Sequence, residues 1–422
     1  MTLEAYSNTI LINAKSVHPS HGSEFGFSWQ WIITLAQRGY QLEVITAIHQ
    51  DNQEVILDYL KQHDIQNINF HFVQYRDVLS FVPIRQVKLY VKYWLWHYHA
   101  YQKAKEICKA KPVALVHQLN TIGFRLPGFQ FLLKKPMVWG PIGGGQPYHL
   151  PLFSHLTFKG KIAKGVYNII NAIQWKFAPY INYCFRRADV ILCSTQEIQE
   201  MVAKKPFVDK TKVFHIPETA CIAEDIRTQK VLSTKEGITI SYACLLHHGK
   251  NLPFIFDMLA RMKGENIGFE LCGEGPQEEE YKAMASEKGL DNIVWHGWLS
   301  KEATKEVIKK SDIFVMSSIR EANSNVIFEA LATATPVISI ALSGMKDTIV
   351  HGVNGYLIPM KKREEMIEEL VSILRQLITD KQKLKQLSDG AYTSAAAHTY
   401  SHRIDELQPI YFKAIQTYYG TH

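Results

Sequence analysis

Residues 317–331 read SSIREANSNVIFEAL, and they follow an apolar segment at 312–317 (DIFVMS) that is typical of a buried strand. They run into a helical pattern that begins near Asn323 or Ser324, because both residue types are favourable N-caps. Glu321 is therefore expected in a loop at the carboxyl end of a strand, where open α/β sheets bind ligands, and Glu329 is expected inside the helix. The first N–H groups of such a helix attract an anion such as a diphosphate. Each glutamate alone is more typical of a solvated surface charge, but the combination predicts a binding site.

The same alternation of short strands and helices extends along the chain in both directions. Strand-like apolar segments occur at 9–13, 42–47, 113–117, 136–139, 189–193 and 212–216. The pattern restarts after residue 220, at 238–244, 269–273, 293–297, 312–317 and 336–340. Two successive runs of this kind predict an α/β protein with two doubly wound domains. We expect an N-terminal domain at 1–220, a C-terminal domain at 221–400, and a C-terminal helix at 401–422 that packs back on the first domain.

Composition excludes several classes of protein. The 422 residues are 46% hydrophobic and 21% charged, which is typical of a globular chain and not of a disordered, collagen-like or coiled-coil one. No stretch of about 18 uncharged apolar residues is long enough to span a bilayer, and residues 1–20 do not resemble a signal peptide. The six cysteines lie far apart without a CxxC pair, which favours reduced thiols. We therefore expect a cytoplasmic protein.

The positive charge is concentrated in the first half of the chain. Residues 1–220 contain 24 Lys and Arg against 14 Asp and Glu, whereas residues 221–422 contain 23 against 26. A basic half suits nucleic acid, anionic lipid or a phosphorylated substrate. Nucleic acid is the weakest of these, because no helix-turn-helix, zinc or RNA-binding motif is present.

Two glycine-rich loops follow predicted strands. Gly22 and Gly26 lie in GSEFG (22–26), between the first strand and its helix, where backbone N–H groups can approach an anion. The spacing does not fit GxGxxG, so a dinucleotide fingerprint is absent and a simple tight turn is an alternative. The second loop, WGPIGGG (139–145), is either a flexible connection or a wall of a ligand cleft.

Several of these segments together resemble one family. Glu321 and Glu329, separated by seven residues, are similar to the paired-glutamate motif of retaining glycosyltransferase family 4, which has the GT-B fold. ALATATPVIS (330–339) and HGVNGYLIP (351–359) agree with the same family, GSEFG (22–26) resembles its first-domain glycine loop, and CGEGP (272–276) and HGWL (296–299) resemble its nucleotide-side loops. VHQLNTIGFRLPGF (116–129) followed by WGPIGGGQP (139–147) resembles members that build bacterial surface polysaccharides. The resemblance covers nearly the whole chain. It implies two Rossmann-like domains that face each other across a cleft, with the acceptor in the first and a nucleotide-diphosphate sugar in the second.

The resemblance also implies roles for individual residues. Glu321 would contact the donor sugar near the reacting carbon, and Glu329 would bind the ribose. Lys250 would neutralise the leaving diphosphate together with the main chain of Asn325 and Val326. Gly22, Gly26 and Glu274 would lie in donor-side loops. His117 would serve the sugar or the acceptor, although a structural histidine at a strand end is nearly as plausible a reading of the same residue.

The sequence departs from the family pattern at the phosphate site. The usual glycine–arginine pair is replaced by Ala243 and Cys244, and the spacing to Lys250 is one residue longer. Either Arg320, His247 or His248 would compensate for the missing arginine, or donor binding is weaker. No DxD sequence of the kind used by metal-dependent sugar transferases is present, so we expect neither a metal nor another cofactor.

Residues 85–105 combine basic and aromatic side chains. On a helical wheel Lys88, Lys92, His99 and Lys103 share one arc, with Trp96 and Tyr98 near its edges. Such a face suits the headgroup zone of an anionic membrane, and Lys159, Lys161 and Lys164 form a second basic cluster. The alternative is a helix that packs its aromatic residues into the first domain.

The leading hypothesis is a cytoplasmic retaining glycosyltransferase, with possible peripheral contact with the membrane. It would move a sugar from a UDP- or GDP-linked donor to a saccharide or lipid-linked acceptor in lipopolysaccharide, capsule or exopolysaccharide synthesis. Another sugar-nucleotide enzyme, such as an epimerase or a phosphorylase, is less favoured. From a different class, the chain would be a catalytically silent scaffold or membrane-surface binding protein.

Overall fold

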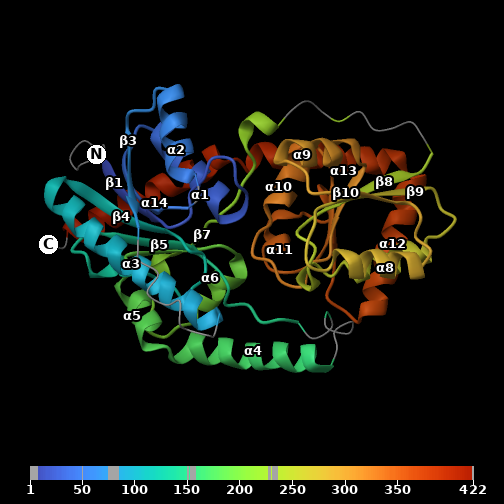
Figure 1. Ribbon diagram of the computed structural model, residues 1–422, viewed down its shortest axis with the longest axis horizontal. Coiled ribbons are helices and arrows are strands. Elements are labelled where there is room, and N and C mark those ends of the chain that lie inside the picture. Colours follow the sequence, from blue (N-terminus) through green and yellow to red (C-terminus); the bar gives the residue numbers. More distant parts are fainter. Residues whose placement is uncertain are drawn as a thin grey trace. The chain divides into compact units, whose positions relative to one another are not determined.

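The computed structural model describes residues 8–49, 51–74, 85–149, 152, 158–226, 230 and 236–420. The chain divides into two compact units (Figure 1). Unit 1 comprises Met1–Gln146, Asn171–Glu218 and Tyr400–His422, and unit 2 comprises Pro147–Ile170 and Thr219–Thr399.

Unit 1 is built on a parallel sheet that has seven strands within the described residues, in the order β3-β2-β1-β4-β5-β6-β7. The strands are β1 (Thr9–Ala14), β2 (Gln41–Ala47), β3 (Ile68–Val73), β4 (Val113–Asn120), β5 (Met137–Ile142), β6 (Val190–Cys193) and β7 (Val213–His215). The central strand β4 is buried at every position. This is the pattern of a parallel strand covered by helices on both faces of its sheet.

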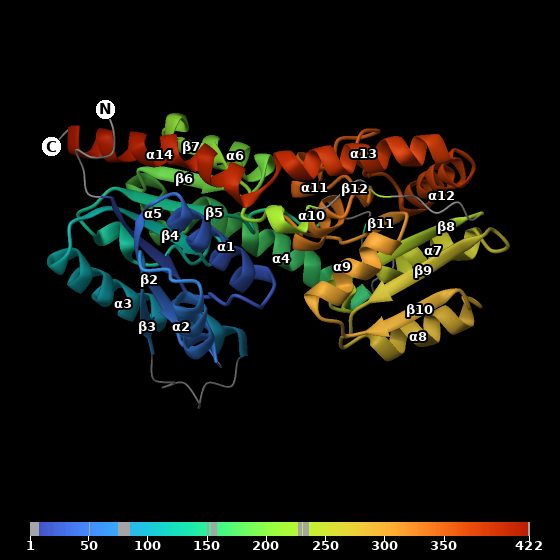
Figure 2. The same cartoon turned by 90° about the horizontal axis from the view of Figure 1, so that it is seen from above.

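The helices of unit 1 are α1 (Ser23–Gln37), α2 (Asn52–Gln62), α3 (Arg85–Ala110), α5 (Pro179–Arg187), α6 (Gln196–Ala203) and α14 (Tyr400–Gly420). The predicted C-terminal helix is confirmed, because α14 packs on α1, β4 and β5 within this unit (Figure 2). Helix α4 (Phe158–Phe177) contributes its first residues to unit 2 and its last seven to unit 1.

Unit 2 contains a second parallel sheet, with six strands in the described part of the chain, in the order β10-β9-β8-β11-β12-β13. The strands are β8 (Ile238–Ala243), β9 (Ile267–Cys272), β10 (Ile293–Gly297), β11 (Ile313–Met316), β12 (Val337–Ile340) and β13 (Gly355–Ile358). The helices are α7 (Leu252–Arg261), α8 (Glu278–Glu287), α9 (Lys301–Lys310), α10 (Asn325–Ala332), α11 (Gly344–Thr348), α12 (Arg363–Thr379) and α13 (Lys381–Ala397).

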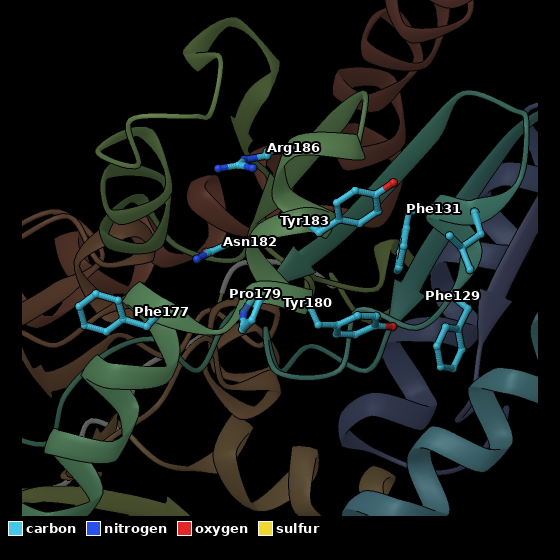
Figure 3. A pocket seen from close by; sticks show the side chains of 9 residues that line it. Phe129, Phe131, Phe177, Pro179, Tyr180, Asn182, Tyr183 and Arg186 are labelled. Carbon is cyan, nitrogen blue, oxygen red and sulfur yellow. The ribbon is translucent and has the colours of Figure 1, made fainter.

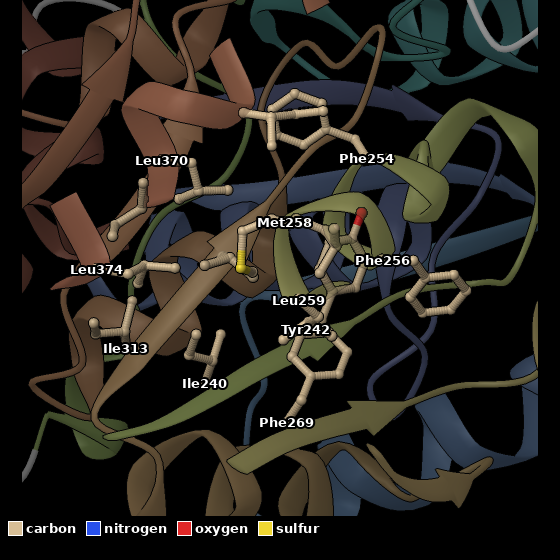
Figure 4. Packing of buried hydrophobic residues seen from close by; sticks show 14 of the residues in the cluster. Ile240, Tyr242, Phe254, Phe256, Met258, Leu259, Phe269, Ile313, Leu370 and Leu374 are labelled. Carbon is tan, nitrogen blue, oxygen red and sulfur yellow. The ribbon is translucent and has the colours of Figure 1, made fainter. Parts of the chain in front are cut away.

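The core of unit 2 lies between its sheet and the helices α7 and α12. Tyr242 and Phe269 come from strands, and Phe254, Met258 and Leu370 come from these helices (Figure 4). This packing fixes the central strands, and with them the loops that leave their carboxyl ends.

The predicted α/β fold with two parallel sheets is confirmed, and two details differ from the prediction. The sequence did not predict the two edge strands β3 and β13: β3 is partly exposed, so its apolar pattern is weak, and β13 has only four residues. Residues 147–170 group with unit 2, although the sequence placed them inside the first domain.

Candidate active site

The site in unit 2 forms where the strand order of the sheet reverses. Strands β8 and β11 are hydrogen-bonded neighbours, although β9 and β10 separate them in the sequence. The loops that follow these two strands therefore begin side by side at the carboxyl edge of the sheet. This is the position at which doubly wound sheets bind their ligands.

Lys250 and Glu321 meet at this edge. The Lys250 Nζ lies 2.6 Å from Glu321 Oε2, and the two side chains are only 17% and 22% exposed. The backbone around Lys250 is fixed as well, because Tyr242 donates a hydrogen bond to the Lys250 carbonyl at 2.6 Å and Ser317 donates to it at 2.9 Å. The structure thus brings together a cation and a carboxylate that are 71 positions apart in the sequence.

Helix α10 directs its N-terminus to the same edge. Ser324 is its N-cap residue, as one of the two expected positions, and its side chain makes no capping hydrogen bond. Asn325 and Val326 occupy the first turn and are partly exposed. Their N–H groups have no acceptor within the helix, so they can serve an anion.

Glu329 lies half-buried in the same helix, which packs on α9. Burial raises the pKa of its carboxyl group, while Lys301 and Lys305 of α9 act in the opposite direction. A carboxylate held in this way can accept hydrogen bonds from a pair of hydroxyl groups.

Glu274 is engaged within the loops of β9 and β10. Its Oε1 accepts a hydrogen bond from the Trp298 N–H at 3.0 Å, which holds the loop after β10. Gly275 lets the loop after β9 approach the loop after β8, because a Cβ there would lie 2.3 Å from the Leu246 carbonyl oxygen. The side chain of Trp298 is 72% exposed beside them. Trp298 lies in HGWL (296–299), which resembles a nucleotide-side loop of the family, but the sequence analysis assigned the tryptophan itself no role.

The residues considered as substitutes for the missing arginine have different environments. Burial raises the pKa of the Cys244 thiol to about 12, so this side chain is neutral. Arg320 donates a hydrogen bond to Tyr167 at 2.8 Å and lies over the rings of Tyr148 and Tyr167. His247 lies near Lys250, and burial and that lysine lower its pKa. Exposed His248 lies 3.9 Å from a carboxylate oxygen of Glu280.

In unit 1 the glycine loop begins α1, for which Gly22 is the N-cap residue. A Cβ at Gly22 would meet nothing within 4 Å, whereas one at Gly26 would lie 2.4 Å from the His21 carbonyl oxygen. Glycine is therefore required at position 26, where the backbone lies close to the His21 carbonyl, whereas a side chain at position 22 would meet no other atom.

His117, for which the sequence left open a sugar or acceptor role and a structural role, lies inside the sheet of unit 1. The residue is fully buried in β4, its Nδ1 lies 2.5 Å from the Tyr411 hydroxyl, and its Nε2 lies 2.7 Å from the Gly140 carbonyl oxygen. Burial lowers the pKa of His117 to about 4. Both nitrogens are engaged, so this histidine anchors α14 to the sheet.

A group of titratable side chains at the edge of the unit 1 sheet was not anticipated. The carboxylate of Glu24 accepts a hydrogen bond from the Ile122 N–H at 3.2 Å, and burial raises its pKa. Burial lowers the pKa of Lys15 to about 8, against the opposing charge of Glu24, and that of His49 to about 4. These residues carry no recognisable spacing, so only the fold brings them together.

The basic face expected on 85–105 differs in one respect. Tyr98 is exposed, but Trp96 is fully buried and donates a hydrogen bond to the Val73 carbonyl oxygen at 3.3 Å. Of the two aromatic residues considered for a membrane face, Trp96 therefore packs into the core of unit 1 and only Tyr98 remains exposed. Within the described residues, no helix is long and apolar enough to cross a membrane, and no three His, Cys, Asp or Glu side chains are placed to hold a metal ion.

The fold is that of the GT-B glycosyltransferases. HepE of Anabaena, solved with UDP and glucose, is 16% identical, with a TM-score of 0.61 over 96% of this chain and 99% of that one. A glycosyltransferase from Rickettsia africae is 14% identical, with a TM-score of 0.65 over 97% and 99% of the two chains.

The sequence comparisons agree with the fold. Residues 223–394 match the family model of glycosyl transferases group 1, so the chain carries a glycosyltransferase domain. The lipopolysaccharide core biosynthesis glycosyltransferase LpsE of Rhizobium meliloti is 26% identical over 193 residues, which cover 44% of this chain and 55% of that protein. The match therefore spans about half the length of this curated relative.

Proposed function

We propose that the protein is a retaining glycosyltransferase of family 4. Unit 2 would bind a UDP- or GDP-linked sugar, and unit 1 would bind a saccharide or lipid-linked acceptor for lipopolysaccharide, capsule or exopolysaccharide synthesis. The similarity to the Rhizobium meliloti lipopolysaccharide glycosyltransferase supports the choice of a surface saccharide.

The observation that carries the proposal is the Lys250–Glu321 pair at the carboxyl edge of the sheet. A bound diphosphate would take over the Lys250 ammonium group and receive the N–H groups of Asn325 and Val326. Glu321 would then be free to accept hydrogen bonds from the donor sugar. Lys250 stabilises the charge that develops on the departing diphosphate, which is an electrostatic contribution to the rate.

The bond changes can be balanced without a further reactant. The bond between the anomeric carbon and the diphosphate oxygen breaks, and its electron pair leaves with the diphosphate. The acceptor hydroxyl forms a bond to the same face of the anomeric carbon, and its proton passes to the leaving diphosphate. The anomeric configuration is thereby retained.

Nucleotide binding tests the donor site directly. Thermal unfolding is measured with UDP, GDP, ADP and CMP, because a ligand at 100 times its Kd adds about 2.7 kcal/mol to the stability of the folded state. We expect one diphosphate to raise the Tm and thereby name the donor class. No shift with any of the four would favour the alternative, a silent GT-B scaffold, for which the neutral Cys244 at the phosphate site is the specific argument.

Two glutamate variants separate binding from turnover. Glu329→Gln is expected to weaken donor binding about tenfold, because it removes an acceptor of ribose hydroxyls. Glu321→Gln is expected to lower kcat about a hundredfold and to change donor affinity little. Glu306→Gln is the matched control, because Glu306 is an exposed carboxylate on neighbouring α9. Unchanged affinity in the Glu329 variant would contradict the ribose assignment.

A further inference from the structure

Helix α4 exposes its apolar face to solvent, whereas its polar face contacts the rest of the protein. Seven large apolar side chains are exposed, with exposed fractions between 48% for Ile170 and 77% for Phe158. On a helical wheel they share an arc of about 120°. They are Phe158, Ile162, Val166, Ile169, Ile170, Ile173 and Phe177. We call this arc the α4 stripe; it runs the length of a 20-residue helix, about 30 Å.

The polar side chains on the opposite face of α4 form hydrogen bonds with the rest of the protein. Within unit 2, Asn168 Nδ2 donates to the Tyr148 carbonyl at 2.9 Å and its Oδ1 accepts from the Tyr148 N–H at 2.8 Å. Within unit 1, Asn171 Nδ2 donates to the Gly145 carbonyl at 2.7 Å, and Arg125 donates to Gln174 at 2.5 Å. These contacts fix the orientation of the helix. The apolar stripe therefore faces outward because the polar side chains are already satisfied inward.

Within unit 1, further apolar side chains lie beside the C-terminal end of α4. Phe177, the last residue of the α4 stripe, also lines an open pocket of about 720 Å³ (Figure 3). The rest of the lining is mostly aromatic and apolar: Phe129, Phe131, Leu132, Pro179, Tyr180, Asn182, Tyr183 and Arg186. Seven exposed large apolar side chains on one face of a single helix are more than folded chains usually leave open to water, so a partner is expected to cover that face.

Charge identifies the partner. Residues 158–177 contain four lysines and no acidic residue, and Lys159, Lys161 and Lys176 are exposed. A second copy of the helix would bring like charges together, whereas an anionic lipid surface complements them. On the same wheel Lys176 lies at one edge of the stripe and Lys161 lies outside it, whereas Lys159 falls within the arc in the first turn, where its long side chain can extend to the headgroups. A helix with a wide apolar face and lysines of this kind lies in the plane of a membrane, with its apolar side among the acyl chains.

We propose that α4 is a membrane-docking helix that inserts the α4 stripe into an anionic bilayer surface. This deepens the proposed function, because a docked enzyme would meet a lipid-linked acceptor at that surface. The docking itself is independent of sugar transfer and is measured without a donor.

Vesicle flotation tests the docking. The full chain is mixed with vesicles of phosphatidylcholine and phosphatidylglycerol in equal parts, or of phosphatidylcholine alone. We expect binding to the anionic vesicles only. The variant Ile162→Ser/Ile169→Ser/Ile173→Ser is expected to bind about a hundredfold more weakly, because it removes inserted hydrocarbon. Lys159→Gln and Lys161→Gln should each cost roughly fivefold, as about 1 kcal/mol per lysine near the surface implies.

The control carries the same chemical change elsewhere on the surface. Val294→Ser/Val350→Ser/Val353→Ser alters three similarly exposed apolar residues of unit 2 and should bind vesicles like the wild type. Equal binding by the isoleucine variant and the wild type would overturn the proposal. So would a wild-type dimer, seen by light scattering, that the isoleucine variant dissociates while neither protein binds vesicles. Nucleotide-induced Tm shifts in the same samples report on the donor site separately, so failure of docking and failure of the proposed function are distinguishable.

Discussion

The carboxyl edges of the two sheets have the same topology and a different electrostatic character. In each unit the first strand lies beside the fourth, β1 beside β4 and β8 beside β11. At the edge of unit 2, Lys250 and Glu321 form an ion pair. At the edge of unit 1, burial shifts Lys15, Glu24 and His49 toward their neutral forms. One edge thus holds a partly exposed ion pair that suits an ionic ligand, whereas burial at the other edge disfavours the charged forms of its three side chains.

The largest effect is expected at the charged edge. Lys250→Met should lower kcat by about a hundredfold to a thousandfold, because a preorganised cation at the leaving group is lost. Lys250→Arg keeps the charge and should recover part of that activity. Steady-state kinetics of the two variants with the donor named by the Tm shifts gives the measurement. If Lys250→Met turned over like the wild type, the electrostatic distinction between the two edges would be lost.

Variants of His117 show whether this residue contributes to sugar transfer or only to the stability of unit 1. His117→Ala should lower the free energy of unfolding by about 3 kcal/mol, because it leaves a cavity and unpaired groups on Tyr411 and Gly140. Tyr411→Phe removes one of the same hydrogen bonds and should cost about 1 kcal/mol. Chemical denaturation measures both. A stable His117→Ala variant with a raised KM for the acceptor would restore the role that the sequence suggested.

Lys15 gives the comparison a pH dependence. The pKa of Lys15 is about 8 in the folded protein, whereas the ordinary pKa of a lysine, which applies to the unfolded chain, is 10.5. The unfolded chain therefore binds more protons between those values, so the free energy of unfolding should rise with pH across that window. The rise from Lys15 is about 2 kcal/mol between about pH 8 and pH 10. Denaturation of the wild type and of Lys15→Met should show this extra slope in the wild type alone; parallel curves would mean that Lys15 is not buried as a cation.

The parts of the site that could be predicted are those encoded locally. The apolar run at 312–317 and the helix that follows it are close together in the chain, and the structure has both, with Ser324 as the N-cap residue but without a side-chain capping hydrogen bond. The Lys250–Glu321 ion pair depends on β8 and β11 being neighbours, which the order of elements alone does not specify. Its two residues were assigned separately, from the resemblance.

Faces of helices could not be predicted, for a related physical reason. Periodicity shows that a helix has an apolar side but not whether that side is buried. The sequence left open whether Trp96 faces a membrane or packs into the first domain, and the residue is buried, whereas Ile169 belongs to an apolar face that is exposed. In α4 the inward face is decided by Asn168 and Asn171, whose partners are backbone groups of distant segments.

The smallest effect on the donor edge of unit 2 is expected from Trp298. It is the exposed aromatic residue held by Glu274 at the carboxyl edge of unit 2, where it can stack on the base of a bound nucleotide. Stacking of a base on an aromatic side chain contributes about 1–3 kcal/mol. Trp298→Ala should therefore weaken the nucleotide Kd about tenfold, by titration calorimetry, and leave the Tm of the free protein unchanged. Trp94→Ala, at an exposed tryptophan of unit 1, is the control. Equal nucleotide affinity in both variants would place the base elsewhere and confine the donor contacts to Lys250, Glu329 and the N-terminus of α10.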